Sequence, residues 1–170
     1  KENNMTPKHE QHGADSKTMQ DSMMTRQHYK MLAMNLAISL AIMYFMMFTM
    51  INSLGELYQN INFLYMALVM WAPMGTLMLL MMSGMYRNKR LNLALHAAFA
   101  MIFVLSFVAI RQQGLVNDQQ FLRSMIPHHS GAILMCREAQ LSDPRVKELC
   151  QNIIPAQRQE IEEMKAILKN

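Results

Sequence analysis

Three long apolar runs, separated by short polar segments, dominate the hydrophobic pattern of the chain. They cover residues 31–51, 61–82 and 91–110, and none of them alternates polar and apolar positions as a barrel strand does. Each run is close to the ~20 residues that a helix needs to cross a ~30 Å hydrocarbon layer, and only helices and closed barrels can cross it. The pattern therefore predicts three transmembrane helices within a membrane region of residues 31–110.

The polar segments on either side of this region differ in pattern. Residues 1–30 show no hydrophobic periodicity, and we expect a flexible tail. Residues 111–170 repeat apolar side chains at three- and four-residue steps on both sides of "SDP", which predicts a soluble antiparallel hairpin of two helices. Asp118 is expected to cap a first helix, which ends near residue 141, and Asp143 a second helix that begins at Pro144.

The predicted fold class is therefore all-α, with three transmembrane helices followed by a helical hairpin. Two short helices cannot bury an apolar face each by pairing only with one another. A bundle made from two hairpins, or docking onto another surface, would cover the remaining faces. We therefore expect the lipid bilayer as one partner, and a homo-oligomer or a larger membrane complex as another.

The distribution of charge predicts the orientation of the chain in the membrane. Basic side chains precede the first run and lie between the second and third, whereas the segment 52–60 contains Glu56 and neither Lys nor Arg. Because cytoplasmic loops are enriched in Lys and Arg, we expect a cytoplasmic N-terminus and a hairpin on the outer side. This topology accounts for the net charge of +4, and because no basic run is interleaved with aromatics we expect no nucleic-acid partner.

The segment "SMIPHHSGAILM", residues 124–135, places two adjacent histidines in an apolar helix. Met125 and His129 share a face of that helix, and Pro127 should bend it so that both imidazoles point toward one region. In the register of the hairpin, Gln157 faces His129, and Met164 lies within one turn of the position opposite Met125. Thioether and imidazole ligands suit Cu(I), whereas the Cys/His spacing of a zinc site is absent and zinc is not expected. Packing of these side chains in a bundle is the alternative interpretation.

Two stretches in this region, "DQQFLRSMIPHHSGAILM" (118–135) and "LCQNIIPAQRQEIEEMKAIL" (149–168), resemble the bacterial DUF305 family, a domain of unknown function. The resemblance covers about a third of the chain and does not include the membrane spans. It implies a ferritin-like bundle and a periplasmic copper-binding protein, here anchored in a bacterial inner membrane. The ligands that it implies are Met125, His128, His129, Met135 and Met164, with Asp118, Gln157 and Glu160 around them.

The two cysteines, Cys136 and Cys150, face each other in the same register. An outer location would allow a disulfide between them. Helix axes lie 8–10 Å apart, however, so only favourably angled pairs come within bridging distance. From the sequence, the bridged and the free state both remain open.

The second apolar run carries a stripe of methionines in a chain that contains 21 of them. The stripe repeats every four residues and consists of Met66, Met70, Met74, Met78 and Met82. Packing is one interpretation, and a thioether path for Cu(I) is the other. His96 is the one histidine or charged residue within the predicted spans, and we expect a neutral ring bonded to Asn35.

These patterns leave three functional hypotheses. The first is a membrane-anchored protein that binds Cu(I), or Ag(I), for storage, delivery or resistance. The second is a structural or accessory subunit of a larger membrane complex without a metal of its own, and the third is a copper-conducting membrane protein. No hydrolase triad, phosphate loop or paired-carboxylate site stands out in the sequence, and we expect no enzymatic activity.

Overall fold

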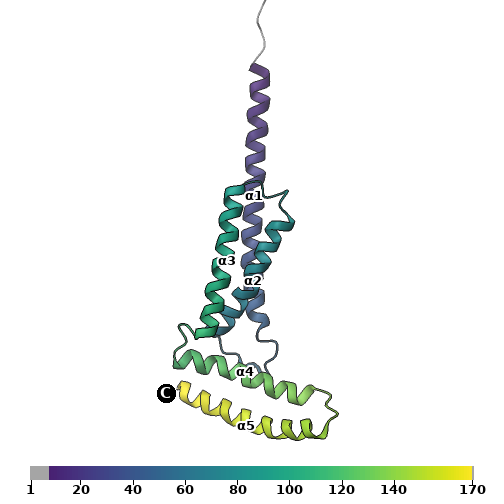
Figure 1. Cartoon of the computed structure of the whole chain (residues 1–170), viewed down its shortest axis with the longest axis vertical. Coiled ribbons are helices and arrows are strands. Elements are labelled where there is room, and N and C mark those ends of the chain that lie inside the picture. The colour runs from purple at the N-terminus through teal and green to yellow at the C-terminus, as the bar shows by residue number, and fades with distance from the viewer. Residues whose placement is uncertain (1–7, 170) are drawn as a thin grey trace, which may run out of the picture.

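The described part of the chain folds into helices. The computed structural model describes residues 8–169, with side chains described for residues 19, 20 and 23–169. These residues form α-helices and one short 3-10 helix and contain no strand, which confirms the all-α prediction. In chain order the elements are α1 (Lys8–Met46), η1 (Leu54–Glu56), α2 (Ile61–Met81), α3 (Lys89–Gln112), α4 (Asp118–Glu138) and α5 (Pro144–Lys169) (Figure 1).

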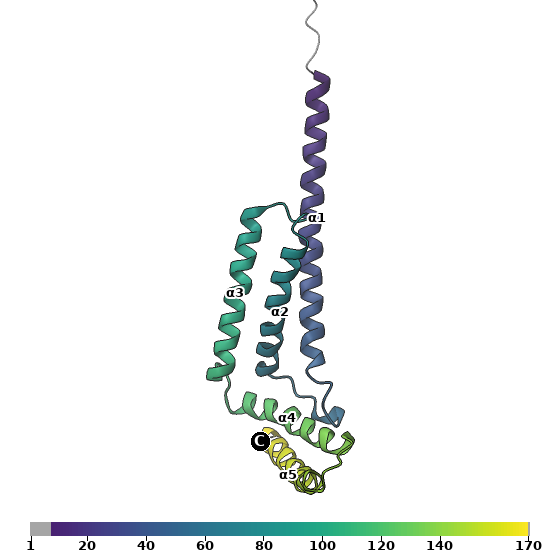
Figure 2. The same cartoon turned by 45° about the vertical axis from the view of Figure 1, so that its right-hand side comes forward.

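Three of these helices are long and apolar enough to cross a membrane. They are Met23–Met46 within α1, the whole of α2, and the whole of α3. Little of their surface is covered by the rest of the protein, as expected for helices that face lipid. They run side by side, and α4 and α5 lie across the end of the bundle remote from the start of α1 (Figures 1 and 2).

α1 differs from the sequence prediction at both of its ends. It begins at Lys8, so residues 8–30 extend the first span as helix instead of forming a tail, and residues 1–7 of that predicted tail lie outside the described residues. The extension contains no proline, and a helix that is already nucleated gains one hydrogen bond for each residue added. At its other end the helix stops at Met46 and residues 47–50 form turns, so the first span ends before residue 51.

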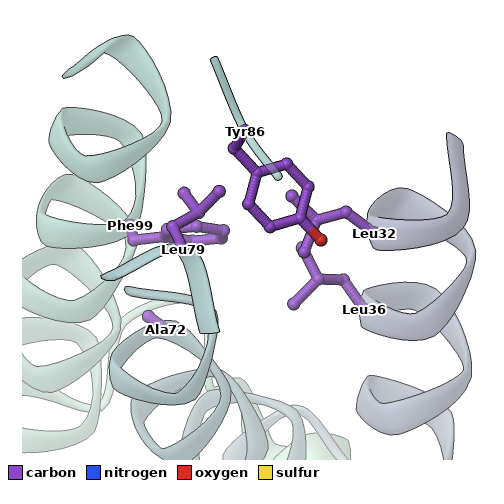
Figure 3. Packing of buried hydrophobic residues seen from close by; sticks show 6 residues of the cluster. All are labelled: Leu32, Leu36, Ala72, Leu79, Tyr86 and Phe99. Atoms are coloured by element: carbon purple, nitrogen blue, oxygen red, sulfur yellow. The ribbon is translucent and has the colours of Figure 1, made fainter. Parts of the chain in front are cut away.

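A small core holds the three membrane helices together (Figure 3). A Cβ atom at Gly75 would lie 2.6 Å from Cζ of Phe99, so the ring on α3 can approach α2 this closely only over a glycine. One turn before Gly75, Trp71 packs edge-on against the same ring, with centroids 5.3 Å apart, and its indole donates to the carbonyl of Leu36 on α1 at 2.7 Å. Close approach over small residues is a common way to join helices in lipid. The buried members of this core are Leu32, Leu36, Ala72, Leu79, Tyr86 and Phe99.

α4 and α5 form an antiparallel hairpin. The side chain of Asn117 caps α4 by accepting from the backbone of Gln120 at 2.9 Å, so Asp118 is the first helical residue and not the predicted cap. α4 ends at Glu138, earlier than the predicted 141. α5 begins at Pro144 as predicted, and Oδ1 of Asp143 accepts from the backbone of Arg145 at 2.8 Å. The hairpin core consists of Ile126, Ile133, Ile161 and Met164.

Hydrogen bonds fix α4 to the membrane helices. Ser130 is fully buried, its hydroxyl donates to the carboxylate of Glu56, and it accepts from the backbone of Asn52 at 2.6 Å. Further along, the side chain of Gln120 accepts from the backbone of Ile61 at 3.0 Å. Because these partners lie in the connection between α1 and α2 and at the start of α2, the hairpin has a defined position on the membrane region.

Candidate metal centre

His129 has a defined ring orientation because both of its nitrogens have partners. Nδ1 lies 2.8 Å from the carbonyl oxygen of Met125, one turn earlier on α4. A carbonyl oxygen only accepts hydrogen bonds, so Nδ1 must carry the proton, and the lone pair of a neutral ring is then on Nε2. A backbone bond to Nδ1 is also the usual way in which a metal-binding histidine presents Nε2.

Nε2 of His129 faces a carboxylate from the other helix. It lies 2.8 Å from Oε2 of Glu160, with the histidine side chain 12% exposed and the glutamate 52% exposed. Since Nδ1 holds the ring proton, a neutral Nε2 and a carboxylate would bring two lone pairs together. A proton held between the two atoms, whichever of them carries it, removes that conflict, and so does a bound cation. The pair therefore forms a position that favours a positive charge.

The sequence register predicts Gln157 opposite His129, and the structure has Glu160 there instead. Side chains on a helix lean toward its own N-terminus. In an antiparallel pair, the side chains of the two helices therefore lean in opposite directions. Two long side chains meet when the residue on α5 lies nearer the C-terminus of that helix than the position directly opposite. The side-chain amide nitrogen of Gln157 lies 3.5 Å from Oε2 of Glu160.

A cavity of about 310 Å³ lies beside this pair. Two methionines border it, Met125 from α4 and Met164 from α5, and Met164 is only 8% exposed. Within the described residues no group of three or more His, Cys, Asp or Glu side chains could hold a metal ion, so a metal held here would depend on the thioethers. The lining residues are Phe121, Met125, His129, Glu160, Glu163, Met164 and Ile167.

The structure thus gathers three of the five predicted ligands around one cavity. Met125, His129 and Met164 line it, whereas Met135 is 53% exposed further along α4 and does not. Glu160 borders the same cavity, and Asp118 lies at the start of α4 outside it.

His128 points elsewhere, and the expectation that Pro127 would aim both imidazoles at one region is wrong. α4 continues as a helix through Pro127, and adjacent residues on a helix diverge by about 100 degrees. His128 lines a separate cavity of about 270 Å³ between α4 and the membrane helices. The two imidazole rings nevertheless stay close, with their centroids 5.9 Å apart.

Comparison with known proteins identifies the family. The profile of the family described as "Domain of unknown function (DUF305)" matches residues 74–168, more than half of the chain. The protein belongs to the DUF305 family.

The match extends further than the motifs around the histidines suggest. Residues 74–168 include the end of α2 and all of α3, so the expectation that the membrane spans lie outside the resemblance is wrong for these two helices and holds for the first span. An uncharacterised protein of Acanthamoeba polyphaga mimivirus is 36% identical over 119 residues, which are 69% of this chain and 76% of that protein. No solved structure matches the chain.

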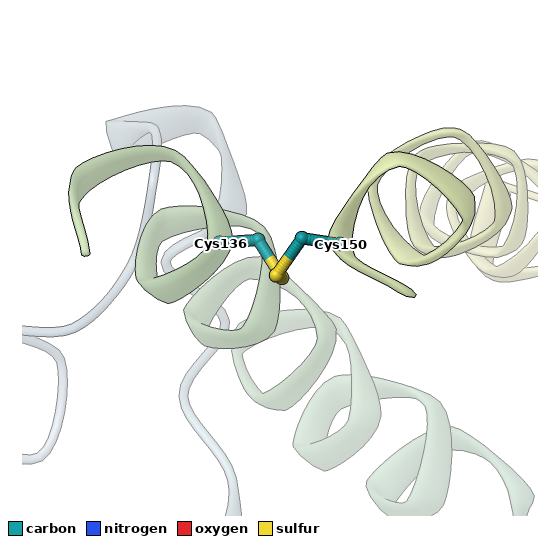
Figure 4. The surroundings of a disulfide bond; sticks show 2 residues. All are labelled: Cys136 and Cys150. Carbon is teal, nitrogen blue, oxygen red and sulfur yellow. A yellow bond between two sulfur atoms is a disulfide. The ribbon is translucent and has the colours of Figure 1, made fainter. Parts of the chain in front are cut away.

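A disulfide closes one end of the DUF305 hairpin. Cys136 and Cys150 are bonded, with their Cα atoms 5.3 Å apart, and join the end of α4 to the start of α5 (Figure 4). Because the side chain of cysteine is short, it hardly leans along the helix axis. The pairing of Cys136 with Cys150 that follows from counting residues on either side of the turn therefore holds. Since both thiols are used and Cys136 lies two turns from His129, the bridge supports the hairpin and supplies no ligand.

The methionine stripe on α2 does not keep to one environment. Met74 and Met78 pack against the membrane core, whereas Met66, Met70 and Met82 are 44%, 45% and 41% exposed. A period of four residues drifts around a helix with 3.6 residues per turn, so the stripe winds from the surface into the core and out again. Met66 lines a cavity together with Met125 and His128 of the hairpin.

His96 is half-buried, and its buried Nδ1 has no hydrogen-bond partner within the described part of the chain. No hydrogen bond joins the ring to Asn35 among the described residues, so the predicted bond is wrong. Asn35 is exposed, whereas Leu32 and Leu36 on the same helix are buried against the other helices.

Two acidic residues, one inside and one outside the DUF305 match, gain roles that were not predicted. Glu163 borders the cavity beside His129, and its position three residues after Glu160 on an amphipathic helix is a signal that could have identified it. Glu56 bonds Ser130, which is 74 residues away in the sequence. No local pattern could have indicated that contact.

Proposed function

We propose that this protein binds a soft monovalent metal ion, Cu(I) or Ag(I), in the DUF305 hairpin and serves in the storage, delivery or resistance of that metal. The observation that carries the proposal is the convergence of Met125, His129 and Met164 on one cavity. These side chains come from two helices, and the ring of the histidine is oriented by a backbone carbonyl.

The donor set favours a soft ion. Thioether sulfur and imidazole nitrogen suit Cu(I), whereas the hard cations Mg²⁺ and Ca²⁺ prefer sets of oxygen ligands. A structural zinc site would require four Cys or His ligands, and both cysteines are bonded to each other. The residues that line the cavity therefore fit Cu(I) or Ag(I) better than zinc.

The carboxylates supply charge rather than soft ligands. Glu160 and Glu163 both border the cavity and are exposed, so they attract a cation from solution without the cost of a buried charge. With an ion bound, Nε2 of His129 would supply its lone pair to the metal, and Glu160 would balance the positive charge of the ion.

The location that we propose is a membrane with the hairpin on its non-cytoplasmic side, the periplasmic side in a bacterium. The disulfide supports this orientation because such bonds persist in oxidising compartments. The basic segment between α2 and α3 lies at the end of the bundle remote from the hairpin, as the positive-inside rule requires (Figure 2).

The test is a titration of the purified full-length protein with Cu(I), kept monovalent by ascorbate, against a chromophoric Cu(I) chelator. His129→Gln, Met125→Leu and Met164→Leu should each weaken binding by more than about tenfold, since even outer-shell substitutions cost a metal site that much. Met135→Leu is the matched control, because Met135 lies on α4 outside the cavity. A wild-type protein that takes up no Cu(I) would contradict the proposal.

The accessory-subunit hypothesis remains the second candidate because Met164 also belongs to the hairpin core. If packing is its whole role, Met164→Leu should be tolerated, because it conserves volume, and no variant should alter copper content. For the third hypothesis, copper conduction, the split of the α2 methionines between core and surface gives no support to a path along the whole stripe.

A further inference from the structure

The cavity that contains His128 lies where the hairpin meets the membrane helices. It has a volume of about 270 Å³ and is bordered by the first turns of α2, the end of α3 and the middle of α4. Besides His128 it is lined by two methionines, Met66 from α2 and Met125 from α4. The proposed function does not use this space.

An unpartnered oxygen lies in the same wall. Asn62 lines the cavity, and its amide nitrogen donates to Gln113 at 3.1 Å and to Ser124 at 3.2 Å. These bonds fix the orientation of the amide, because the oxygen of Gln113 can only accept. Oδ1 of Asn62 is buried and has no hydrogen-bond partner in the described part of the chain. A buried acceptor without a partner costs about 1–3 kcal/mol, so the residues around this cavity include an unsatisfied polar group.

Met125 connects this cavity to the one beside His129. It lines both, and the rings of His128 and His129 have their centroids 5.9 Å apart. One set of donors is Met66, His128 and Met125, and the other is Met125, His129 and Met164. A single thioether therefore belongs to both sets.

Building on the proposed function, we propose that the cavity lined by Met66, Met125 and His128 is a second soft-metal site, which exchanges its ion with the His129 site through Met125. The exchange is a change of ligands without electron transfer. The ion gives up Met66 and His128 and gains His129 and Met164, while Met125 stays within reach throughout. The site links the membrane region to the hairpin and gives Met66 a role that the rest of the methionine stripe lacks.

The decisive experiment is the Cu(I) stoichiometry of the full-length protein in detergent, measured with the chelator competition for the wild type, Met66→Leu and Met70→Leu. Met70 is the matched control, because it lies one turn further along α2 and is 45% exposed against 44% for Met66, but does not line the cavity. We expect two ions per chain for the wild type and for Met70→Leu, and one for Met66→Leu. His128→Gln should also bind one ion, and Met125→Leu should bind both ions more weakly.

The outcomes separate this inference from the proposed function. A wild type that binds no Cu(I) contradicts both. A wild type that binds a single ion, or a Met66→Leu variant that still binds two, contradicts the second site and leaves the His129 site standing. As an independent readout, Ag(I) should protect Met66 but not Met70 from oxidation, measured by mass spectrometry of the peptides. Equal protection of the two would contradict the inference even if a variant failed to fold.

Discussion

Methionine has different roles in the membrane region, residues 31–110, where 14 of the 21 methionines lie, and in the hairpin, residues 111–170, where only three lie. On α2, Met74 and Met78 pack against the buried residues of the membrane core. In the hairpin, Met125 and Met164 border a cavity that also contains an oriented imidazole and two carboxylates. A thioether thus becomes a candidate ligand through its neighbours, and the abundance of methionine by itself indicates nothing.

The two regions also differ in what holds them together. The membrane helices meet over small residues and leave most of their surface to lipid, whereas the hairpin has a compact core, a disulfide and a capped turn. Damage to one region should therefore leave the other folded.

The largest effect is expected in the core of the hairpin. Ile161→Ala removes a side chain that is 1% exposed and should lower the free energy of unfolding of the hairpin by about 2–5 kcal/mol. Ile167→Ala on the same helix is the control, because Ile167 is exposed and should change stability by less than about 0.5 kcal/mol. Thermal unfolding followed by circular dichroism compares them, and equal losses would show that the hairpin core is misassigned.

Reduction of the disulfide should have the next largest effect. The bridge joins residues 14 positions apart, and closing a loop of that size is worth about 3 kcal/mol in the chain-entropy account. The double variant Cys136→Ser/Cys150→Ser should therefore unfold at a lower temperature and retain the membrane helices. Oxidised wild type that reacts with an alkylating agent before reduction would contradict the bond itself.

A smaller effect is expected for overpacking in the membrane region. Gly75→Ala places a methyl group against the ring of Phe99 and should cost about 1–3 kcal/mol, while the smaller side chain in Gly75→Ala/Phe99→Leu should relieve the clash. Unfolding in detergent by denaturant measures both variants. If Gly75→Ala also changed Cu(I) binding by the hairpin, the two regions would not be independent.

The smallest effect concerns the start of α5. Hydrogen bonds from Arg145 hold the pKa of the Asp143 carboxyl below its ordinary value of 3.8. A lowered pKa means that the ionised form stabilises the folded state at pH values above the unfolded pKa, and that this contribution is lost as the pH falls through the lowered one. Asp143→Ala should therefore melt at a lower temperature than wild type at neutral pH, and the difference should shrink in acid. A difference independent of pH would exclude the charge as its source.

Much of the fold could be predicted from the sequence because its signals are local. Lipid requires a helix of about 20 apolar residues, so the spans are visible as runs. Asp143 and Pro144 are a helix start whatever surrounds them. The position of the hairpin could not be predicted, since it depends on Ser130 meeting Glu56 and Asn52 across the fold.

The candidate site was partly predictable for the same reason. Met125 and His129 share a helix face by spacing alone, and Met164 follows from the antiparallel register. The partner of His129 was predicted one turn away from its actual position on α5. Counting residues from the turn does not include the opposite directions in which side chains lean on two antiparallel helices. The separation of His128 from His129 was missed because Pro127 was expected to bend the helix and bring the two rings together, whereas α4 continues as a helix through this residue.

The most direct test of the central claim is X-ray absorption at the copper edge, on the oxidised protein loaded with one equivalent of Cu(I). If thioethers in the hairpin hold the ion, its first shell contains sulfur, and sulfur scattering falls in Met125→Leu/Met164→Leu while remaining unchanged in Met135→Leu. A first shell of nitrogen and oxygen alone, or a spectrum that is the same in all three proteins, would contradict the account.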